Sequence, residues 1–82
     1  MHYVYLLESL ADPARTYVGY ARDLKARLGV HHAGGSRHTR KFRPWKLLTY
    51  VAFSSKYQAL AFERYLKSHS GRAFAAKRLG FH

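Results

Sequence analysis

The stretch Thr16–His32, which reads TYVGYARDLKARLGVHH, is the most informative part of this chain for its fold. Its first residues are mostly β-branched or aromatic, and such side chains fit the half-buried surface of a strand. Gly19 lets the backbone turn or another group approach closely. Beyond it, Leu24 and Leu28 are four residues apart, as on one face of a helix. The stretch therefore predicts a strand that leads through Gly19 into a helix.

Asp23, Arg27 and His31 form a second row on the same predicted helix, beside the apolar residues. An arginine and a histidine one turn apart, next to Tyr17 on a strand, could converge on one anionic group. The alternative is a solvated helix face on which Asp23 and Arg27 form an ordinary ion pair. This stretch taken alone leaves both interpretations open.

Length and composition are those of one small folded domain. The chain has 82 residues, of which 48% are apolar and 16% aromatic, so it is too hydrophobic to be disordered. No apolar run approaches the roughly 20 residues of a membrane span, and no signal-peptide pattern opens the chain. The absence of cysteine excludes disulfides and thiolate metal sites and is compatible with a reducing cytoplasm. We expect a single domain over residues 1–82, located in the cytoplasm and not in a membrane.

The charge balance points to a polyanionic partner. Fifteen lysines and arginines face only four acids, which gives a net charge of +11 with neutral histidines. Because the basic residues are spread along the chain rather than gathered on one amphipathic helix, nucleic acid is a better match than a membrane surface. Four carboxylates can hardly build a two-metal site. One hard cation held by one carboxylate, water and substrate phosphate is compatible with them.

Periodicity and turn signals predict three strands and three helices. The first strand is apolar on both faces, with Tyr5 on one of them, so it should be central. A turn signal at Asp12 and Pro13 joins it to the second strand as a hairpin, which places Tyr5 and Tyr17 on neighbouring strands. We predict an α+β fold in which helices flank a small three-stranded mixed or antiparallel sheet. The predicted elements are strands at His2–Glu8, Thr16–Tyr20 and Leu47–Phe53, and helices from Arg22 or Asp23 to before Gly34, from Ser55 to about Ser68, and from Ala73 to Leu79.

The segment from Gly34 to Lys46 is basic and contains no acid. Basic side chains interleaved with aromatic ones suit nucleic-acid backbones and bases. One interpretation is therefore that the segment contacts phosphates, with Trp45 stacking on a base. The other is a solvated loop that Trp45 anchors to the core. The nucleic-acid-binding residues that we predict, including one at the start of the first helix, are Arg22, Arg37, Arg40, Lys41, Arg43 and Trp45.

Glu63 is the only acid in the second half of the chain, and most of its neighbours one helical turn away are apolar. An unpaired carboxylate against apolar surface would be costly. Glu63 therefore needs either a charge partner, such as Arg64, Lys67 or a more distant base, or a bound cation.

The chain contains two short triplets, followed by the predicted helix with Arg27 and then the predicted helix with Glu63. The triplets are Tyr3-Val4-Tyr5 and Tyr17-Val18-Gly19, with a hairpin loop between them. Taken together, these features resemble the GIY-YIG nuclease domain, and specifically its small stand-alone bacterial branch. The segment from His38 to Leu47 is similar to the one that leads into the third strand of this branch. The resemblance covers nearly the whole chain.

The resemblance implies roles for five residues and one metal ion. Arg27 would clamp the scissile phosphate, and Glu63 would bind one Mg²⁺ or Mn²⁺ ion. Tyr17, Tyr5 and His31 are the candidates for the general base that takes a proton from water. The family favours a tyrosine, although a free phenol, with a pKa of about 10, needs nearby cations to serve at neutral pH. We rank Tyr17 first; His31 has the more ordinary pKa for a base and could instead position a tyrosine or water.

The chain departs from the family pattern at two points. Tyr3 stands where the first triplet usually has glycine, a change that concerns the backbone more than the chemistry. Many members also have an asparagine after the glutamate helix, whereas this chain contains no asparagine. The second departure leaves one family role without an assigned residue.

The resemblance implies a metal-dependent endonuclease that hydrolyses DNA phosphodiester bonds by a one-metal mechanism. Because so small a domain has no attached recognition module, single-stranded or branched DNA is a better expected substrate than plain duplex. We expect a monomer or a weak dimer. The alternative is a catalytically weak or inactive nucleic-acid-binding module with the same fold, which the missing asparagine permits. A third hypothesis, based on charge alone, is a basic protein that binds RNA or ribosomes.

Overall fold

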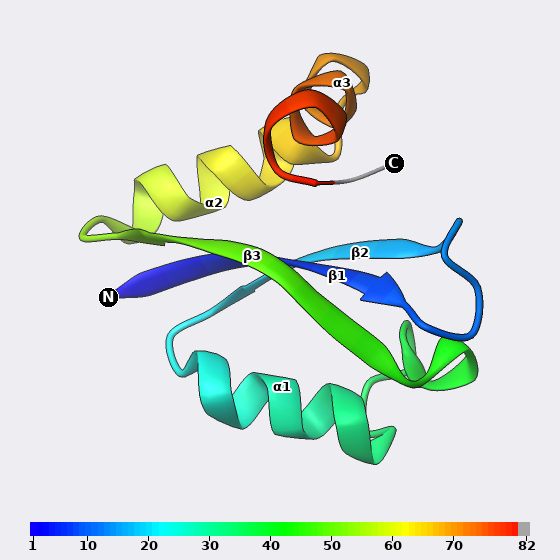
Figure 1. Ribbon diagram of the computed structural model, residues 1–82. Coiled ribbons are helices and arrows are strands. Elements are labelled where there is room, and N and C mark those ends of the chain that lie inside the picture. Colours follow the sequence, from blue (N-terminus) through cyan, green and yellow to red (C-terminus); the bar gives the residue numbers. More distant parts are fainter. Residues whose placement is uncertain (81–82) are drawn as a thin grey trace.

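The computed structural model describes residues 1–80. Within these residues the chain forms three strands, three α-helices and one short 3-10 turn. The strands make one antiparallel sheet in the order β2-β1-β3, so the first strand is central, as predicted (Figure 1). The elements in chain order are β1 (His2–Ser9), β2 (Thr16–Ala21), α1 (Leu24–Ala33), η1 (Arg40–Phe42), β3 (Trp45–Phe53), α2 (Lys56–Leu66) and α3 (His69–Arg78).

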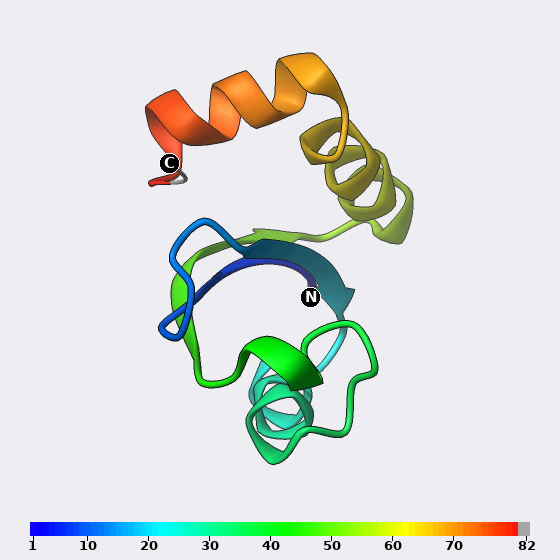
Figure 2. The same cartoon turned by 90° about the vertical axis from the view of Figure 1, so that its right-hand side faces the viewer.

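Helices cover both faces of the sheet because both faces of β1 are apolar. Val4 and Leu6 point to one face, where they pack with Leu66 of α2 in the core. Tyr5 and Leu7 point to the opposite face, against which the leucines of α1 pack. In Figures 1 and 2, α1 lies on one side of the sheet and α2 and α3 lie on the other. Alternation along a single strand thus divides the core into two layers.

The strand register gathers tyrosines on the α1 face. In the pairing of β1 with β2, Tyr5 lies opposite Gly19 and Leu7 lies opposite Tyr17, so the two predicted tyrosines do occupy neighbouring strands. On its other side Tyr5 pairs with Tyr50 of β3. Residues directly opposite one another in an antiparallel pair have their side chains on the same face. Tyr5, Tyr17 and Tyr50 therefore share the face that α1 covers.

Side-chain caps and a glycine set the ends of the first two helices. Asp23 precedes α1 and accepts a hydrogen bond from the backbone N–H of Ala26. Ser55 caps α2 in the same way, by accepting a 3.3 Å hydrogen bond from the backbone N–H of Gln58. At the other end of α1, Gly34 has a left-handed φ of 79°, which stops the helix where the sequence predicted.

The last helix begins earlier than predicted, at His69 instead of Ala73. Ser68 caps it by accepting a 3.1 Å hydrogen bond from the backbone N–H of Gly71. Gly71 therefore lies inside α3 and not in a break. A Cβ on Gly71 would overlap the carbonyl oxygen of Tyr65, so this glycine permits α2 and α3 to approach closely. Local sequence cannot distinguish a glycine that breaks a helix from one that lets two helices touch.

The predicted α+β fold is confirmed, and its sheet is antiparallel rather than mixed. The strands are slightly longer than predicted, since β1 continues to Ser9 and β3 begins at Trp45. None of the helices in residues 1–80 is long and apolar enough to cross a membrane.

Candidate active site

Tyr5 and Tyr17 form an aromatic pair on the α1 face of the sheet. Their ring centroids are 6.2 Å apart. Gly19, directly opposite Tyr5, leaves the room that the pair needs. A Cβ at position 19 would overlap the Tyr5 hydroxyl and lie 2.8 Å from Cε2 of Tyr17. Because Gly19 lies within β2, it permits a close approach and does not make a turn.

His31, in the last turn of α1, reaches both tyrosines. Its Nε2 is 2.7 Å from the Tyr5 hydroxyl oxygen, and its ring centroid is 5.1 Å from that of Tyr17. The residue is only 1% exposed. Burial lowers the pKa of His31 below its ordinary value of 6.5, and the positive charges of Arg27 and His32 act in the same direction. His31 is therefore a buried, neutral ring at neutral pH.

Thr39 contacts the other ring nitrogen of His31. Its hydroxyl oxygen is 2.6 Å from Nδ1, and in the described part of the chain this is the only hydrogen bond of that hydroxyl. The carbonyl of the same residue accepts a 2.7 Å hydrogen bond from the indole N–H of Trp45. A buried chain of contacts thus runs from Trp45 through Thr39 and His31 to Tyr5. Sequence analysis missed Thr39, because no local pattern distinguishes this buried threonine from the exposed basic residues around it.

Trp45 anchors the basic segment to the core. It is 5% exposed and packs in the same cluster as Tyr5 and Leu7. Its ring cannot stack on a base in this position, so the prediction of Trp45 as a nucleic-acid-binding residue is wrong. The alternative that we considered, an anchor to the core, is the one that the structure supports. A tryptophan in a basic segment has the same local sequence in both cases, and only the packing distinguishes them.

Arg27 is exposed on α1, one turn before His31. Asp23 does not pair with it in the described structure. The Asp23 carboxylate instead caps the helix, with Oδ1 3.0 Å from the backbone nitrogen of Ala26. The ordinary ion pair considered for this helix face is thus not formed, and the Arg27 guanidinium faces solvent.

Tyr5 is influenced by charges from both helix layers. Burial is the main cause that raises its pKa well above the ordinary range, and Tyr17 and the negative charge of Glu63 raise it further. The positive charge of Arg27 acts in the opposite direction. Arg27 on α1 and Glu63 on α2 therefore act electrostatically on the same phenol. Of the five predicted catalytic residues, Tyr5, Tyr17 and His31 touch one another, whereas Arg27 is exposed on α1 and Glu63 lies on α2, at the other face of the sheet.

Glu63 has the charge partner that its apolar surroundings require. Its Oε2 is 3.2 Å from Nζ of Lys67, one turn further along α2. Lys67 is one of the partners that we considered for it. The Glu63 side chain is 22% exposed, so water and small ions can reach the carboxylate.

Basic side chains line two cavities. The first, of about 540 Å³, lies at the β2 edge beside Tyr17. The second, of about 380 Å³, lies at the basic segment and is lined by three of the predicted nucleic-acid-binding residues. The basic residues are Arg15, Lys67 and Arg72 in the first cavity, and Arg40, Lys41 and Arg43 in the second. Arg22 and Arg37 are also exposed, and Arg22 lies at the start of α1.

Residues 1–78 match the family model of the GIY-YIG catalytic domain, and this range includes the whole cluster around Tyr5. The chain belongs to the GIY-YIG family. GIY-YIG domains form a nuclease superfamily. The resemblance seen in the two triplets and the two helices is therefore confirmed.

This GIY-YIG chain is similar in sequence to small proteins named UPF0213. Two of them, from Streptococcus pyogenes serotype M5 (strain Manfredo) and serotype M2 (strain MGAS10270), are each 43% identical over 72 residues, which is 87% of this chain and 76% of theirs. The solution NMR structure of a UPF0213 protein from Bacillus halodurans is 34% identical, with a TM-score of 0.59 over 96% of this chain and 86% of that one. These names state no activity, substrate or metal.

Proposed function

We propose that this GIY-YIG protein is a metal-dependent endonuclease that hydrolyses DNA phosphodiester bonds by a one-metal mechanism. The observation that supports this most directly is the cluster at Tyr5. This phenol hydrogen-bonds His31, packs beside Tyr17 and is affected electrostatically by Arg27 and Glu63 from the two faces of the sheet. Phosphodiester hydrolysis needs a cation for the phosphate, a ligand for a metal ion and a base near the attacking water. The cluster offers one group for each.

Tyr17 is the general base that we propose, because the other two candidates are less accessible. Both ring nitrogens of His31 are engaged by protein groups, and the ring is buried. Tyr5 is buried as well, and its raised pKa means that it keeps its proton at neutral pH. Tyr17 is partly exposed and borders the basic cavity at the β2 edge, where an anionic strand is attracted.

Thr39 determines which nitrogen of His31 bears the proton. A buried hydroxyl with one hydrogen-bonding partner avoids a costly unsatisfied donor by giving its proton to that partner, here Nδ1. Nε2 of His31 then bears the ring proton, and this N–H donates a hydrogen bond to the Tyr5 oxygen. In this arrangement His31 positions Tyr5, and the Tyr5 hydroxyl donates its own proton in another direction.

One Mg²⁺ or Mn²⁺ ion fits the donors at Glu63. Residues 1–80 contain no group of three or more His, Cys, Asp or Glu side chains that could enclose a metal. Mg²⁺, however, is commonly held by one or two carboxylates together with water and substrate phosphate, and Glu63 supplies one accessible carboxylate. Lys67 would release its ion pair when the ion binds. The bound ion would supply charge neutralisation at the scissile phosphate, which Arg27 would hold from the other side of the sheet edge.

Cleavage assays on two substituted proteins test this proposal. Glu63→Ala and Arg27→Ala should each reduce Mg²⁺-dependent cleavage of DNA by about 10²–10³-fold, the loss typical of a group that stabilises the transition state. Arg64→Ala is the matched control, because it removes an exposed charge next to Glu63. Circular dichroism and urea denaturation establish that each variant is folded. Parental cleavage by both alanine variants would place the active site elsewhere.

The substrates in this assay decide the form of DNA that is cut. Matched single-stranded, duplex and flap oligonucleotides are incubated with Mg²⁺ or with a chelator. We propose that single-stranded and branched substrates are cut faster, because a small domain reads exposed bases and backbone more readily than duplex sequence. Equal rates on all three would contradict this preference.

A nucleic-acid-binding module without catalysis is the second candidate, and the Glu63–Lys67 ion pair favours it. The pair satisfies the carboxylate without any metal. The missing asparagine points in the same direction. This candidate predicts salt-sensitive binding with no cleavage in Mg²⁺ or Mn²⁺. Lys67→Ala separates the two at saturating DNA, where the charge lost from the basic cavity does not limit the rate: freeing Glu63 should preserve or raise cleavage in an endonuclease and produce none in a binding module.

A further inference from the structure

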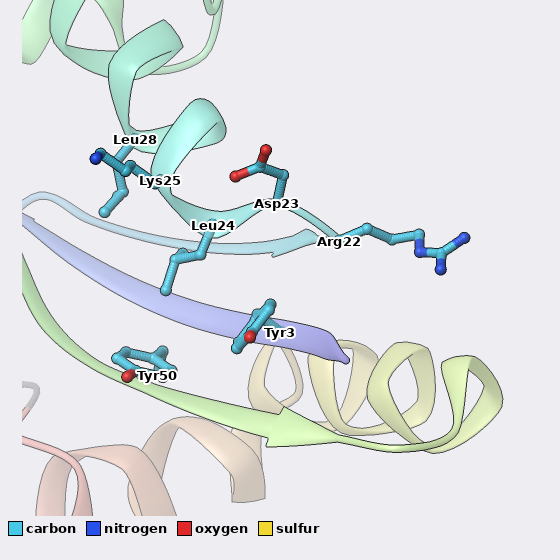
Figure 3. Close-up of a pocket in the computed structure, with 7 residues that line it drawn as sticks. All are labelled: Tyr3, Arg22, Asp23, Leu24, Lys25, Leu28 and Tyr50. Atoms are coloured by element: carbon cyan, nitrogen blue, oxygen red, sulfur yellow. The ribbon is translucent and has the colours of Figure 1, made fainter.

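A third cavity, of about 520 Å³, opens beside the N-terminal end of α1 (Figure 3). Its volume is within the range of pockets that hold small organic groups. Tyr3 of β1 and Tyr50 of β3 form its aromatic wall, and Leu24 of α1 faces them. Arg22 and Lys25 lie on either side of the same helix start. None of these residues except Arg22 has a role in the site described above.

The two tyrosines leave an aromatic face open to a partner. Their ring centroids are 5.8 Å apart and the planes meet at 69°, an edge-to-face contact. Tyr50 is 50% exposed, so the neighbouring Tyr3 covers only part of it. The aromatic wall is therefore built by two side chains on neighbouring strands, Tyr3 on β1 and Tyr50 on β3.

The charges around the pocket favour an anionic ligand. Arg22 and Lys25 are both exposed, and the Arg22 side chain in Figure 3 extends away from the sheet into open space. The one acid at the pocket, Asp23, already accepts the hydrogen bond that caps α1. An aromatic face with cations beside it is the combination that binds bases and phosphates of an unpaired strand.

The pocket shares two lining residues with a neighbouring cavity that reaches Arg27. Arg22 and Asp23 line a further cavity of about 340 Å³, which extends along α1 to Arg27. A strand with one phosphate on Arg27 can therefore follow the start of α1 past Arg22 and reach the tyrosines. A base inside a duplex is stacked on its neighbours and cannot enter such a pocket without being unstacked.

We propose that the pocket between Tyr3, Tyr50 and Leu24 binds one unpaired nucleobase of single-stranded DNA, stacked on Tyr50, with an adjoining phosphate on Arg22 or Lys25. The proposal rests on the proposed function in that it takes the substrate to be DNA, and it names the feature that selects a single strand. The pocket excludes paired bases by geometry, whereas the basic cavities attract any polyanion.

Binding measurements in a chelator test the pocket without any need for cleavage. Fluorescence anisotropy gives the Kd for a labelled single strand of about 12 nucleotides at fixed salt. Tyr50→Ala should weaken binding by about 5- to 150-fold, the loss expected for one stacked base. Tyr50→Phe keeps the ring and should bind as the parent does. Tyr57→Ala, which removes an exposed tyrosine on α2, is the matched control and should also bind as the parent does.

Single abasic positions along the strand locate the stacked base. For the parent protein, a strand with one particular abasic position should bind about as weakly as the intact strand binds to Tyr50→Ala. The Tyr50→Ala protein should bind this abasic strand and the intact strand equally well, because both changes remove the same contact. The Kd for the matching duplex should be the same for the parent and Tyr50→Ala. For a matched single strand of RNA, Tyr50→Ala should bind more weakly than the parent, because the pocket contacts the base.

Several outcomes would overturn the proposal. Parental binding of the single strand by Tyr50→Ala would do so, and so would an equal loss for duplex or an abasic effect that persists in Tyr50→Ala. These results do not depend on catalysis. If the protein binds as predicted but cleaves no DNA, the pocket proposal stands and the proposed endonuclease function fails. If it cleaves DNA but Tyr50→Ala has no effect on binding, the proposed function stands and the pocket proposal fails.

Discussion

Replacing Thr39 with valine removes one hydroxyl from the middle of the buried contact chain and keeps most of the side-chain volume. The Thr39 hydroxyl is 2.6 Å from Nδ1 of His31, and both residues are buried. Valine leaves Nδ1 without this partner. The hydrogen bond from Trp45 to the backbone carbonyl at position 39 does not require the hydroxyl. The substitution therefore isolates one hydrogen bond.

The expected cost follows from the burial of the group left behind. A buried polar atom that loses its partner typically costs about 1–3 kcal/mol. The total free energy of unfolding for a chain of this length is about 4–12 kcal/mol, so Thr39→Val should still fold. Thr39→Ser keeps the hydroxyl and loses a buried methyl group, which costs about 1 kcal/mol. The two variants thus remove different parts of one side chain.

Urea denaturation followed by the fluorescence of Trp45, the only tryptophan, measures both free energies of unfolding. Long-range proton–nitrogen NMR spectra report which nitrogen of His31 bears the proton. The parent and Thr39→Ser should show a single form protonated at Nε2, whereas Thr39→Val should lose this preference. Cleavage by Thr39→Val should fall, while that by Thr39→Ser should be retained.

Two results would refute this reasoning. One is a Thr39→Val protein as stable as the parent within about 0.5 kcal/mol, the range of an ordinary surface substitution. The other is a parent in which His31 is protonated at Nδ1, because the Thr39 hydroxyl would then accept the hydrogen bond instead of donating it. Either result would remove the role that we give to Thr39.

Two further predictions concern residues around the same ring. Gly19→Ala should displace Tyr5 from His31 and reduce cleavage, and it should lower the free energy of unfolding measured in urea by about 1–3 kcal/mol. Gly29→Ala is the control: it lies on a helix with open space around it and should be at least as stable as the parent. Cleavage by Gly19→Ala at the parental rate would contradict the close approach. Burial lowers the pKa of His31, so the unfolded chain binds its proton first as the pH falls. The contribution of His31 to stability should therefore be fully present above about pH 6.5 and be lost as the pH falls through the lower folded pKa. His31→Gln should flatten this part of the pH profile of stability, exposed His32→Gln should not, and identical profiles for His31→Gln and the parent would contradict the assignment.

Local patterns were sufficient for the family and for every strand and helix except the start of α3, where Gly71 was taken for a break. Strand and helix periodicity, the caps at Asp23 and Ser55 and the glycine at position 34 depend on residues only a few positions apart. The two apolar faces of β1 also predicted its central place in the sheet. The order of the two triplets and the two helices was enough to indicate the GIY-YIG family, which the family model then confirmed.

The chemistry of the site depends on contacts between residues far apart in the chain. Tyr5 and His31 are 26 positions apart, and their hydrogen bond exists only because α1 packs on the face of β1 that displays Tyr5. Trp45, which was predicted to stack on a base, is buried against the same face and anchors the basic segment there. The role of Thr39 likewise depends on packing, because the fold places its hydroxyl beside Nδ1 of His31.

The sequence alone thus indicated most of the candidate residues, although it missed Thr39 and misassigned Trp45, because residue type and short-range spacing are local properties of a chain. It could not specify their partners, proton positions or exposure, because these depend on which surfaces the tertiary structure buries together. Glu63 shows both levels: its pairing with Lys67, four residues further along the same helix, is a local contact that the sequence could propose, whereas the 22% exposure of its side chain depends on how α2 packs. The pocket at Tyr3 and Tyr50 is likewise invisible in sequence, since its walls come from two strands joined by the sheet and a helix packed above them.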